Sequence, residues 1–75
     1  MQRRRDRLLA ALGLRLRQLR DERGWTQEAF AEEADIDRSY VAGVESGLRN
    51  PSLKALAKMA GGFGMTVSDF LKTVR

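Results

Sequence analysis

QEAFAEEADIDRSYVAGVES, residues 27–46, is the stretch that decides the fold of this 75-residue chain. Its apolar residues recur at helical spacing in two groups, Phe30, Ala31 and Ala34, and then Val41 and Val44. Between the groups, residues 35–37 leave room for nothing longer than a tight corner. Two helices joined so closely must cross steeply, which requires a small residue at the crossing, and Ala31 is the candidate. This is the geometry of a helix-turn-helix.

The residues that flank these two helices agree with their boundaries. Thr26 can cap the first helix with its side-chain oxygen, and Glu28 adds negative charge to the first turn. Asp37 can cap the second helix, and Gly47 is well placed to end it. The stretch therefore carries start and stop signals for both helices.

Upstream, residues 14–23 predict a first helix whose inward face is Leu16 and Leu19. Three more leucines precede it at the same spacing: Leu8, Leu9 and Leu12. One longer helix that reaches Arg23 is therefore an alternative. Gly13 interrupts that longer stripe, at a position where glycine is about 1 kcal/mol less favourable than alanine.

Downstream, Ser52 can cap a fourth helix, which closes at Gly61-Gly62 or at Gly64. Its inward face is predicted to be Leu53, Leu56, Ala57 and Ala60. Thr66 can cap a last short helix. The sequence therefore predicts an all-α fold, a compact bundle of five helices.

The composition excludes several classes of function. Neither Cys nor His occurs, which rules out disulfides, thiol catalysis and Cys/His zinc sites. We expect no metal, cofactor or small-molecule ligand. We also expect no enzymatic activity, because the serine hydroxyls have no candidate base. No apolar run approaches the roughly 20 residues that a membrane span needs, so we expect a cytoplasmic protein.

Charge is unevenly distributed along the chain, whose net charge is +4. Residues 1–23 carry eight Arg against three acids, and residues 24–37 carry five acids without a cation. Residues 38–58 carry four cations against Glu45. This polarity suits an anionic partner, such as nucleic acid, that approaches from one side, although a solvated Arg-rich surface is the alternative.

In this order and spacing, the chain resembles the Cro/CI-type (XRE) helix-turn-helix family of DNA-binding regulators. The similarity runs from Leu12 to Leu71 and includes Leu16, Leu19-Arg20, Gly24-Trp25-Thr26-Gln27, Phe30-Ala31, Ile36, Val41, Val44-Glu45, Gly47, Asn50-Pro51-Ser52, Leu56, Phe63-Gly64 and Phe70-Leu71. Residues 36–45, IDRSYVAGVE, are especially similar to controller proteins of restriction–modification systems. The family usually has Gly where this chain has Asp35, but Asp tolerates the left-handed conformation that such a turn needs.

The resemblance implies a lambda-repressor-like domain over residues 12–75. Residues 1–11 form a basic N-terminal extension, which is a continuation of the first helix, a flexible basic arm on DNA phosphates, part of a dimer surface or a frayed tail. The resemblance also implies a structural salt bridge between Arg20 and Glu45.

The outward side of the helix that begins after Asp37 consists of short side chains and one cation. We assign base readout in duplex DNA to four residues there: Arg38, Ser39, Ala42 and Gly43. An arginine can bind guanine through O6 and N7, and an alanine can touch a thymine methyl. The alternative for Arg38 is an ion pair with Asp35 or Asp37. Gly43 permits close approach to DNA or to another element of the protein, and the alternative is that a glycine is simply tolerated there.

Phosphate contacts are assigned to five residues around that helix: Gln27, Tyr40, Ser46, Arg49 and Asn50. Such contacts fix the register on DNA without reading its sequence. The assignment of Gln27 comes from the family resemblance, and a plain first-turn residue is its alternative. For Tyr40, the alternative is partial burial against the fourth helix.

The C-terminal region is rich in large apolar residues, Phe63, Met65, Phe70 and Leu71. They either finish the core or form a self-complementary dimer interface, which two-fold symmetry would make isologous. The predicted function is a sequence-specific transcription regulator that binds an inverted-repeat operator as a homodimer. A restriction–modification controller is the first choice; a phage repressor, an antitoxin or a protein-interaction module without DNA readout remain alternatives. Membrane-surface binding by residues 1–19 is a further alternative.

Overall fold

The caps of the helices form as their sequence signals indicate, with one exception. In the computed structural model, which describes residues 6–75, the hydroxyls of Thr26, Ser52 and Thr66 each accept a hydrogen bond from the backbone amide three residues on. Asp37 lies at the N-cap position but makes no such bond. Five helices follow from these starts: α1 Arg7–Glu22, α2 Gln27–Ala34, α3 Arg38–Glu45, α4 Leu53–Gly62 and α5 Val67–Leu71. Residues 6–75 contain no strand, which confirms the all-α five-helix prediction.

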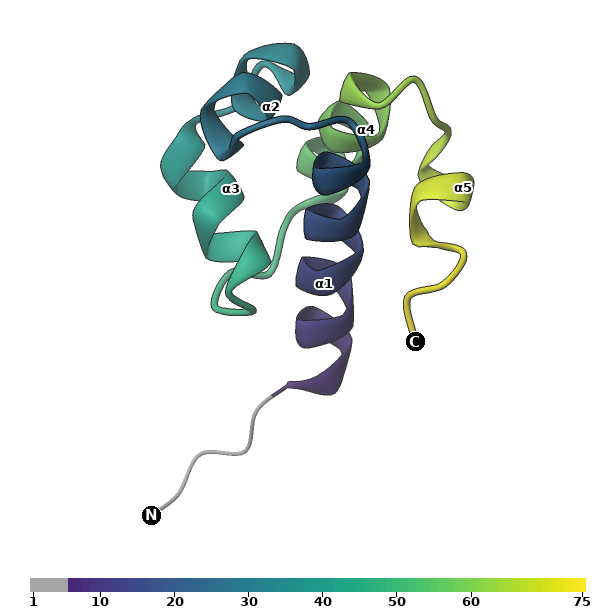
Figure 1. The fold of residues 1–75 in the computed structure, drawn as a ribbon. Helices are drawn as coiled ribbons and strands as arrows, with labels where there is room; N and C mark the ends of the chain where they lie inside the picture. The colour runs from purple at the N-terminus through teal and green to yellow at the C-terminus, as the bar shows by residue number, and fades with distance from the viewer. Residues whose placement is uncertain (1–5) are drawn as a thin grey trace.

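Helix α1 is the axis around which the other helices are arranged. It stands upright in Figure 1, with α2 and α3 on one side and α5 on the other. It begins at Arg7 because the Asp6 carboxylate accepts hydrogen bonds from the amides of Leu8 and Leu9. The longer of the two predicted helices is therefore the one observed, and residues 7–11 form its first turns. The rest of the predicted extension, residues 1–5, lies outside the described residues.

Gly13 is the residue that allows α1 and α3 to touch. A Cβ atom at Gly13 would lie 2.5 Å from the carbonyl oxygen of Glu45 and 2.6 Å from that of Val44. Side chains do not approach backbone atoms so closely, so only glycine fits here without a shift of one helix. The interpretation of Gly13 as a mere interruption of the stripe misses this reason, because the contact is made with a helix 30 residues further on.

The core is formed by buried side chains from all five helices and is joined by an aromatic stack. Phe30 and Phe63 have ring centroids 4.4 Å apart, and Trp25 stacks on Phe63 at 5.9 Å. Phe70 is fully buried beside them. Of the two alternatives for the C-terminal aromatic residues, Phe63 and Phe70 finish the core, and they offer almost no exposed surface to a partner.

The inward face of α4 is predicted correctly in part. Ala60 is buried and Leu56 is partly buried against the core, as predicted, but the rest of the face differs. Ala55, Met59 and Ala60 are buried, whereas Leu53 is 73% exposed and Ala57 is also exposed. The segment LKALAKMA has apolar residues on two neighbouring stripes, so the 3.6-residue period does not choose between them. The observed rotation places small alanines against the neighbouring helices, while Leu53 points into solvent.

The corner between α2 and α3 depends on a left-handed residue. Asp35 has φ of 57° and ψ of 50°, and the Ile36 amide donates to the Ala31 carbonyl at 3.0 Å. Ala31 is 5% exposed, as a small residue at the helix crossing should be. Asp therefore adopts the conformation that Gly more often supplies in such turns.

Replacing Asp35 with glycine is expected to stabilise the domain by about 1 kcal/mol, because a side chain in the left-handed region is strained. The Lys58 ammonium lies 4.0 Å from the Asp35 carboxylate, whose side chain is 97% exposed, so little is lost with that ion pair. For a domain of this size the change corresponds to a rise in Tm of about 4–8 °C. Thermal unfolding followed by circular dichroism measures it. An unchanged or lower Tm for Asp35→Gly would mean that the corner carries no strain.

Within residues 6–75, none of the helices has the length and hydropathy to cross a membrane.

Candidate nucleic-acid interface

Helix α3 turns one side to the core and the other to solvent. Val41 and Val44 are fully buried, and they fix the rotation of the helix. Arg38 and Ser39 are exposed in the first turn, and Ala42 and Gly43 are half-buried further along. The solvent side therefore carries the residues predicted for it, which are the cation Arg38 at the start of the helix and residues with short side chains after it. Such a surface lets a helix backbone come close to the floor of a groove.

Arg38 has no ion-pair partner among residues 6–75. The alternative of a pair with Asp35 or Asp37 is therefore not observed. Asp37 instead accepts a hydrogen bond from the Ser39 hydroxyl. Arg38 lies beside Gln27 and Glu28 at an open groove between the start of α2 and α3. Its guanidinium is consequently available to an acceptor outside the protein.

Arg49, in the loop after α3, is held against that helix. Its guanidinium carbon lies 4.7 Å from the centroid of the Tyr40 ring, a cation–π contact, and its amide donates to the Gly43 carbonyl at 3.1 Å. A Cβ atom on Gly43 would lie 3.3 Å from the Arg49 Cβ. Gly43 thus permits the close approach of another part of the protein, which is the predicted role preferred over mere tolerance, and it also lies on the solvent side of α3.

Tyr40 takes the partly buried position. Its hydroxyl accepts a hydrogen bond from the Ser52 amide at 3.3 Å, at the start of α4. The ring and the hydroxyl therefore tie the α3–α4 loop to α3. Ser46 donates its hydroxyl to the Gly43 carbonyl at 2.9 Å, and Asn50 is exposed in the same loop. The structure groups Tyr40, Gly43 and Arg49 together, because Arg49 contacts both of these α3 residues.

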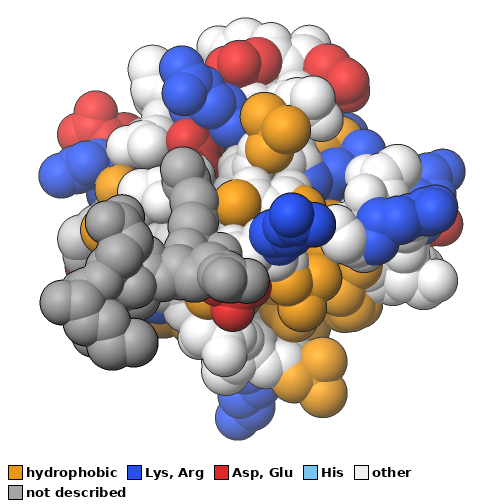
Figure 2. All heavy atoms as spheres, turned by 90° about the horizontal axis from the view of Figure 1, so that it is seen from below, with side chains coloured by type: hydrophobic (Ala, Val, Ile, Leu, Met, Phe, Trp, Pro, Cys, Tyr) orange, Lys and Arg blue, Asp and Glu red, His pale blue; other side chains and the backbone are white. Residues whose placement is uncertain are grey.

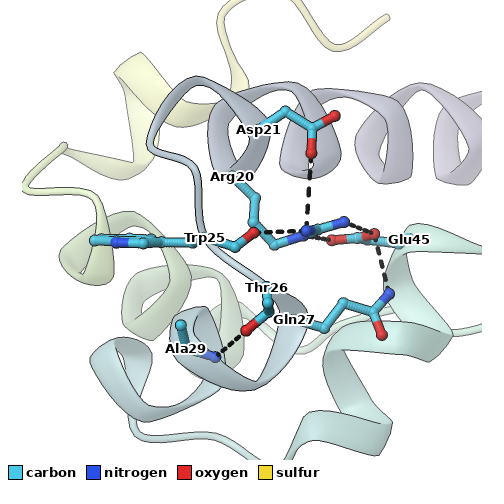
Figure 3. A network of polar contacts seen from close by, with 7 residues as sticks. All are labelled: Arg20, Asp21, Trp25, Thr26, Gln27, Ala29 and Glu45. Atoms are coloured by element: carbon cyan, nitrogen blue, oxygen red, sulfur yellow. Dashed lines mark hydrogen bonds and ion pairs between the residues drawn. The ribbon is translucent and has the colours of Figure 1, made fainter.

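A polar network links α1, α2 and α3 beneath this surface (Figure 3). The Arg20 guanidinium donates to both Glu45 oxygens, at 2.7 and 3.0 Å, and to the Trp25 carbonyl at 2.7 Å. Gln27 donates to the same Glu45 carboxylate at 3.1 Å. The side chains of Arg20 and Glu45 are 12% and 7% exposed. The structure thus joins Arg20 to Glu45, and it places Gln27 in their network as well as beside Arg38.

The hydrogen bond to Glu45 raises the pKa of Arg20 above its ordinary value, and this effect outweighs burial, which lowers it. Arg20 is therefore a cation at every pH at which the domain folds. The bidentate geometry is the arrangement in which a guanidinium and a carboxylate bind most strongly.

Two further arginines, one within α1 and one just after it, serve the fold. Arg15 donates to the carbonyls of Phe70 and Asp69 at 2.9 and 3.0 Å, which fastens α5. Arg23 donates to the Phe63 carbonyl at 3.0 Å and lies over the Phe63 ring. In the sequence these residues count only as part of a basic segment. No local signal distinguishes them from arginines that face solvent, since the carbonyls to which they donate lie 40 or more residues away.

No group of three or more metal-ligating side chains occurs in residues 6–75. This surface can bind a partner through the unpaired cation Arg38, through Arg49, which is stacked on Tyr40, and through close approach of the α3 backbone.

Known proteins are similar to this chain in sequence and in structure. The Helix-turn-helix family matches residues 16–70. A control protein of a Mycoplasma species, C.MunI, is 40% identical over 63 residues, which cover 83% of this chain and 85% of that protein. The restriction–modification controller protein C.AhdI from Aeromonas hydrophila is 42% identical, with a TM-score of 0.79 over 83% of this chain and 94% of its own. The controller protein C.Esp1396I, solved as a tetramer with its natural 35 base-pair operator, is 29% identical, with a TM-score of 0.83 over 92% of this chain and 91% of its own.

Proposed function

This chain belongs to the helix-turn-helix family in its Cro/CI-type form, and we propose that it is a sequence-specific transcription regulator that binds duplex DNA as a homodimer. The observation that carries this proposal is the solvent side of α3, where Arg38 has no partner in residues 6–75 and the neighbouring side chains are short. Arginine without an internal partner, at the start of a helix that can enter a groove, is suited to bind an external acceptor.

In the proposed complex, α3 lies in the major groove. Arg38 binds a guanine through O6 and N7, and Ala42 contacts a thymine methyl. Ser39 reaches a base edge once its hydroxyl leaves Asp37. A homodimer places its two α3 helices in successive turns of the major groove on one face of the duplex, with half-sites about 34–36 Å apart. Because the dimer is two-fold symmetric, the operator is an inverted repeat.

Phosphate contacts position the complex. Arg49 is held in place by Tyr40, so less side-chain entropy is lost when it meets a phosphate. Gln27, Ser46 and Asn50 complete the set around α3. The pair of Arg20 and Glu45 joins α1 to α3 and takes no part in contact with DNA. Binding weakens as salt rises, because neutralised phosphates release their counterions.

Among regulators, we propose a restriction–modification controller. Support comes from the similarity to controller proteins over most of both chains, and from residues 36–45. We expect no catalytic activity, because the family consists of regulators and the chain has neither His nor Cys. A protein whose partner is DNA acts in the compartment that holds the DNA, and we place it in the cytoplasm.

Replacing Arg38 with alanine is expected to weaken binding to the selected operator by about 1–3 kcal/mol per half-site, because a bidentate contact to guanine is lost. Affinity for an unrelated duplex should change little. Fluorescence anisotropy with the two labelled duplexes measures both values. Lys72→Ala, which removes the same charge beside α5, is the matched control and should leave both unchanged. Equal losses on the two duplexes for Arg38→Ala would make Arg38 a phosphate contact and remove it from base readout.

A further inference from the structure

Gln27 connects the buried polar network to the open groove between the starts of α2 and α3. It is the first residue of α2 and is half-buried. On the inner side, its amide nitrogen donates to the Glu45 carboxylate at 3.1 Å. On the outer side, it lines the groove together with Glu28 and Arg38. One side chain therefore contacts the interior of the protein and also faces the surface to which base readout is assigned.

The direction of the Gln27 amide is set by the chemistry of its partner. A carboxylate that is paired with an arginine accepts hydrogen bonds and cannot donate them. The Gln27 nitrogen, which carries two hydrogens, must therefore face Glu45, because the amide oxygen is an acceptor too. Figure 3 shows the nitrogen of Gln27 directed toward Glu45 and its oxygen directed away. One N–H bond is used inside the protein, and the second is left for an acceptor at the groove.

Glu45 is itself held firmly. Arg20 donates to both of its oxygens, at 2.7 and 3.0 Å, and the Glu45 side chain is 7% exposed. Arg20 also neutralises the negative charge of Glu45, so an anion at the groove meets little repulsion from this carboxylate. Arg20, Glu45 and Gln27 thus form a chain of hydrogen bonds that ends at the groove, and successive bonds in such a chain polarise one another.

This support distinguishes Gln27 from side chains that only face solvent. Charged side chains around the end of the molecule at which α1 begins are scattered over the surface, as the view from below shows (Figure 2). A side chain of that kind samples several rotamers and loses this freedom when it meets a partner. Gln27 has lost part of that freedom already, because its amide is bonded within the folded protein. It can therefore bind an external acceptor at a smaller entropic cost.

We propose that Glu45 is a positioning residue for DNA binding, which holds the Gln27 amide so that its second N–H donates to a backbone phosphate. The inference rests on the proposed function for DNA as the partner and for the phosphate contact of Gln27. It adds the residue on which that contact depends. Glu45 acts through Gln27 and does not touch DNA. The buried pair of Arg20 and Glu45 thereby contributes to recognition as well as to stability.

A double-mutant cycle between Glu45→Gln and Gln27→Met tests the proposal. The first change keeps the shape of the side chain but adds a donor, so the direction of the Gln27 amide is no longer fixed. The second keeps the length of the side chain and removes its amide. Glu45→Gln should weaken DNA binding by about 3–10-fold per half-site, the effect of one hydrogen bond. In the Gln27→Met background, the same change should alter binding by less than about twofold.

Fluorescence anisotropy with a labelled duplex measures the four affinities, at a temperature at which circular dichroism shows every variant folded. Glu28→Gln is the matched control. It removes the same charge from the same groove, but Glu28 is exposed and makes no hydrogen bond to Gln27 within residues 6–75. Loss of a negative charge beside DNA should strengthen binding slightly, and equally in both backgrounds. The two carboxylates should therefore have effects of opposite sign.

Two results of the cycle would overturn the proposal. One is a folded Glu45→Gln variant that binds DNA as tightly as the wild type or more tightly. The other is a loss of affinity that is the same with and without the Gln27 amide. An equal loss in both backgrounds is what a residue that acts only on folding would give.

Heteronuclear NMR of the Gln27 side-chain amide tests the proposal even if Glu45→Gln does not fold. In the free protein, one amide proton of Gln27 should resonate downfield of those of Gln18, which is exposed on α1. The second should move downfield when a duplex is added, because it then binds a phosphate. Gln27 resonances that match those of Gln18, or a second proton that DNA leaves unchanged, would contradict the proposed role of Glu45.

Failure of the positioning role and failure of the proposed function give different results. A phosphate contact does not read sequence, so the cycle can be measured on any duplex that the protein binds. A protein that prefers no sequence but shows coupling between Glu45 and Gln27 rejects the regulator and supports the positioning role. A protein that selects an inverted repeat without such coupling supports the regulator and rejects the positioning role. A protein that binds no duplex overturns both.

Discussion

Replacing Glu45 with alanine is expected to lower the free energy of unfolding by about 3–5 kcal/mol, because it leaves the Arg20 cation without its carboxylate in a site that is largely closed to water. Arg20 is 12% exposed, and its remaining acceptors are the Trp25 carbonyl and, at 3.8 Å, Asp21. A small domain has a total stability of about 5–15 kcal/mol, so this loss is a large share of it. Gln27 would lose its acceptor as well.

Urea unfolding followed by Trp25 fluorescence measures this change, since Trp25 is the single tryptophan and stacks in the core. Asp21→Ala is the control, because it removes the other carboxylate near Arg20. The Asp21 side chain is 63% exposed. Exposed ion pairs contribute about 0–1 kcal/mol, so the control should unfold nearly as the wild type does. Similar losses in both variants would show that Glu45 has no special role.

The contribution of Arg20 should not depend on pH in the working range. Its pKa is higher in the folded protein than its ordinary value, so the stabilisation is complete below the unfolded-state pKa and declines only as pH rises through the folded value. Between about pH 6 and 9 the guanidinium is charged in both states, and this term stays constant.

Gly13→Ala should destabilise the protein by about 1–3 kcal/mol, although alanine is the better helix former by about 1 kcal/mol. The added Cβ would lie 2.5 Å from a backbone oxygen of α3, and backbone atoms cannot turn aside as a flexible side chain can. The same urea titration measures the change.

Gly61→Ala is the matched control for Gly13→Ala. Gly61 lies within α4, and a Cβ there would meet nothing within 4 Å. Alanine should therefore stabilise this position by about 0.4–1 kcal/mol. The sign of the effect should differ between the two sites. A stabilising Gly13→Ala would contradict the close packing of α1 on α3.

Residues with local signals could be predicted from the sequence, and residues with distant partners could not. Thr26, Ser52 and Thr66 cap helices through bonds three residues away, so their role is visible in a short window. The left-handed conformation of Asp35 could be expected from the family resemblance, because the family usually has Gly at this position. The role of Gly13 could not be predicted, because the group that excludes a larger residue there is the backbone carbonyl of Glu45, which is distant in the sequence.

The candidate site divides in the same way. The outward position of Arg38 follows from the burial of Val41 and Val44 on the same helix. The exposure of Leu53 could not be predicted, because two apolar stripes compete on α4 and only packing against other helices decides between them. Nor could the stacking of Arg49 on Tyr40, which depends on how the α3–α4 loop returns across α3.

The most direct measurement of the central claim, that the solvent side of α3 reads DNA sequence, is selection from a random duplex library by the purified protein. Near-physiological salt, about 150 mM, suppresses binding that is purely electrostatic. We expect enrichment of an inverted repeat whose half-site centres lie one helical turn, about 10–10.5 base pairs, or a multiple of it apart. Binding that is sensitive to salt but enriches no sequence would contradict the claim.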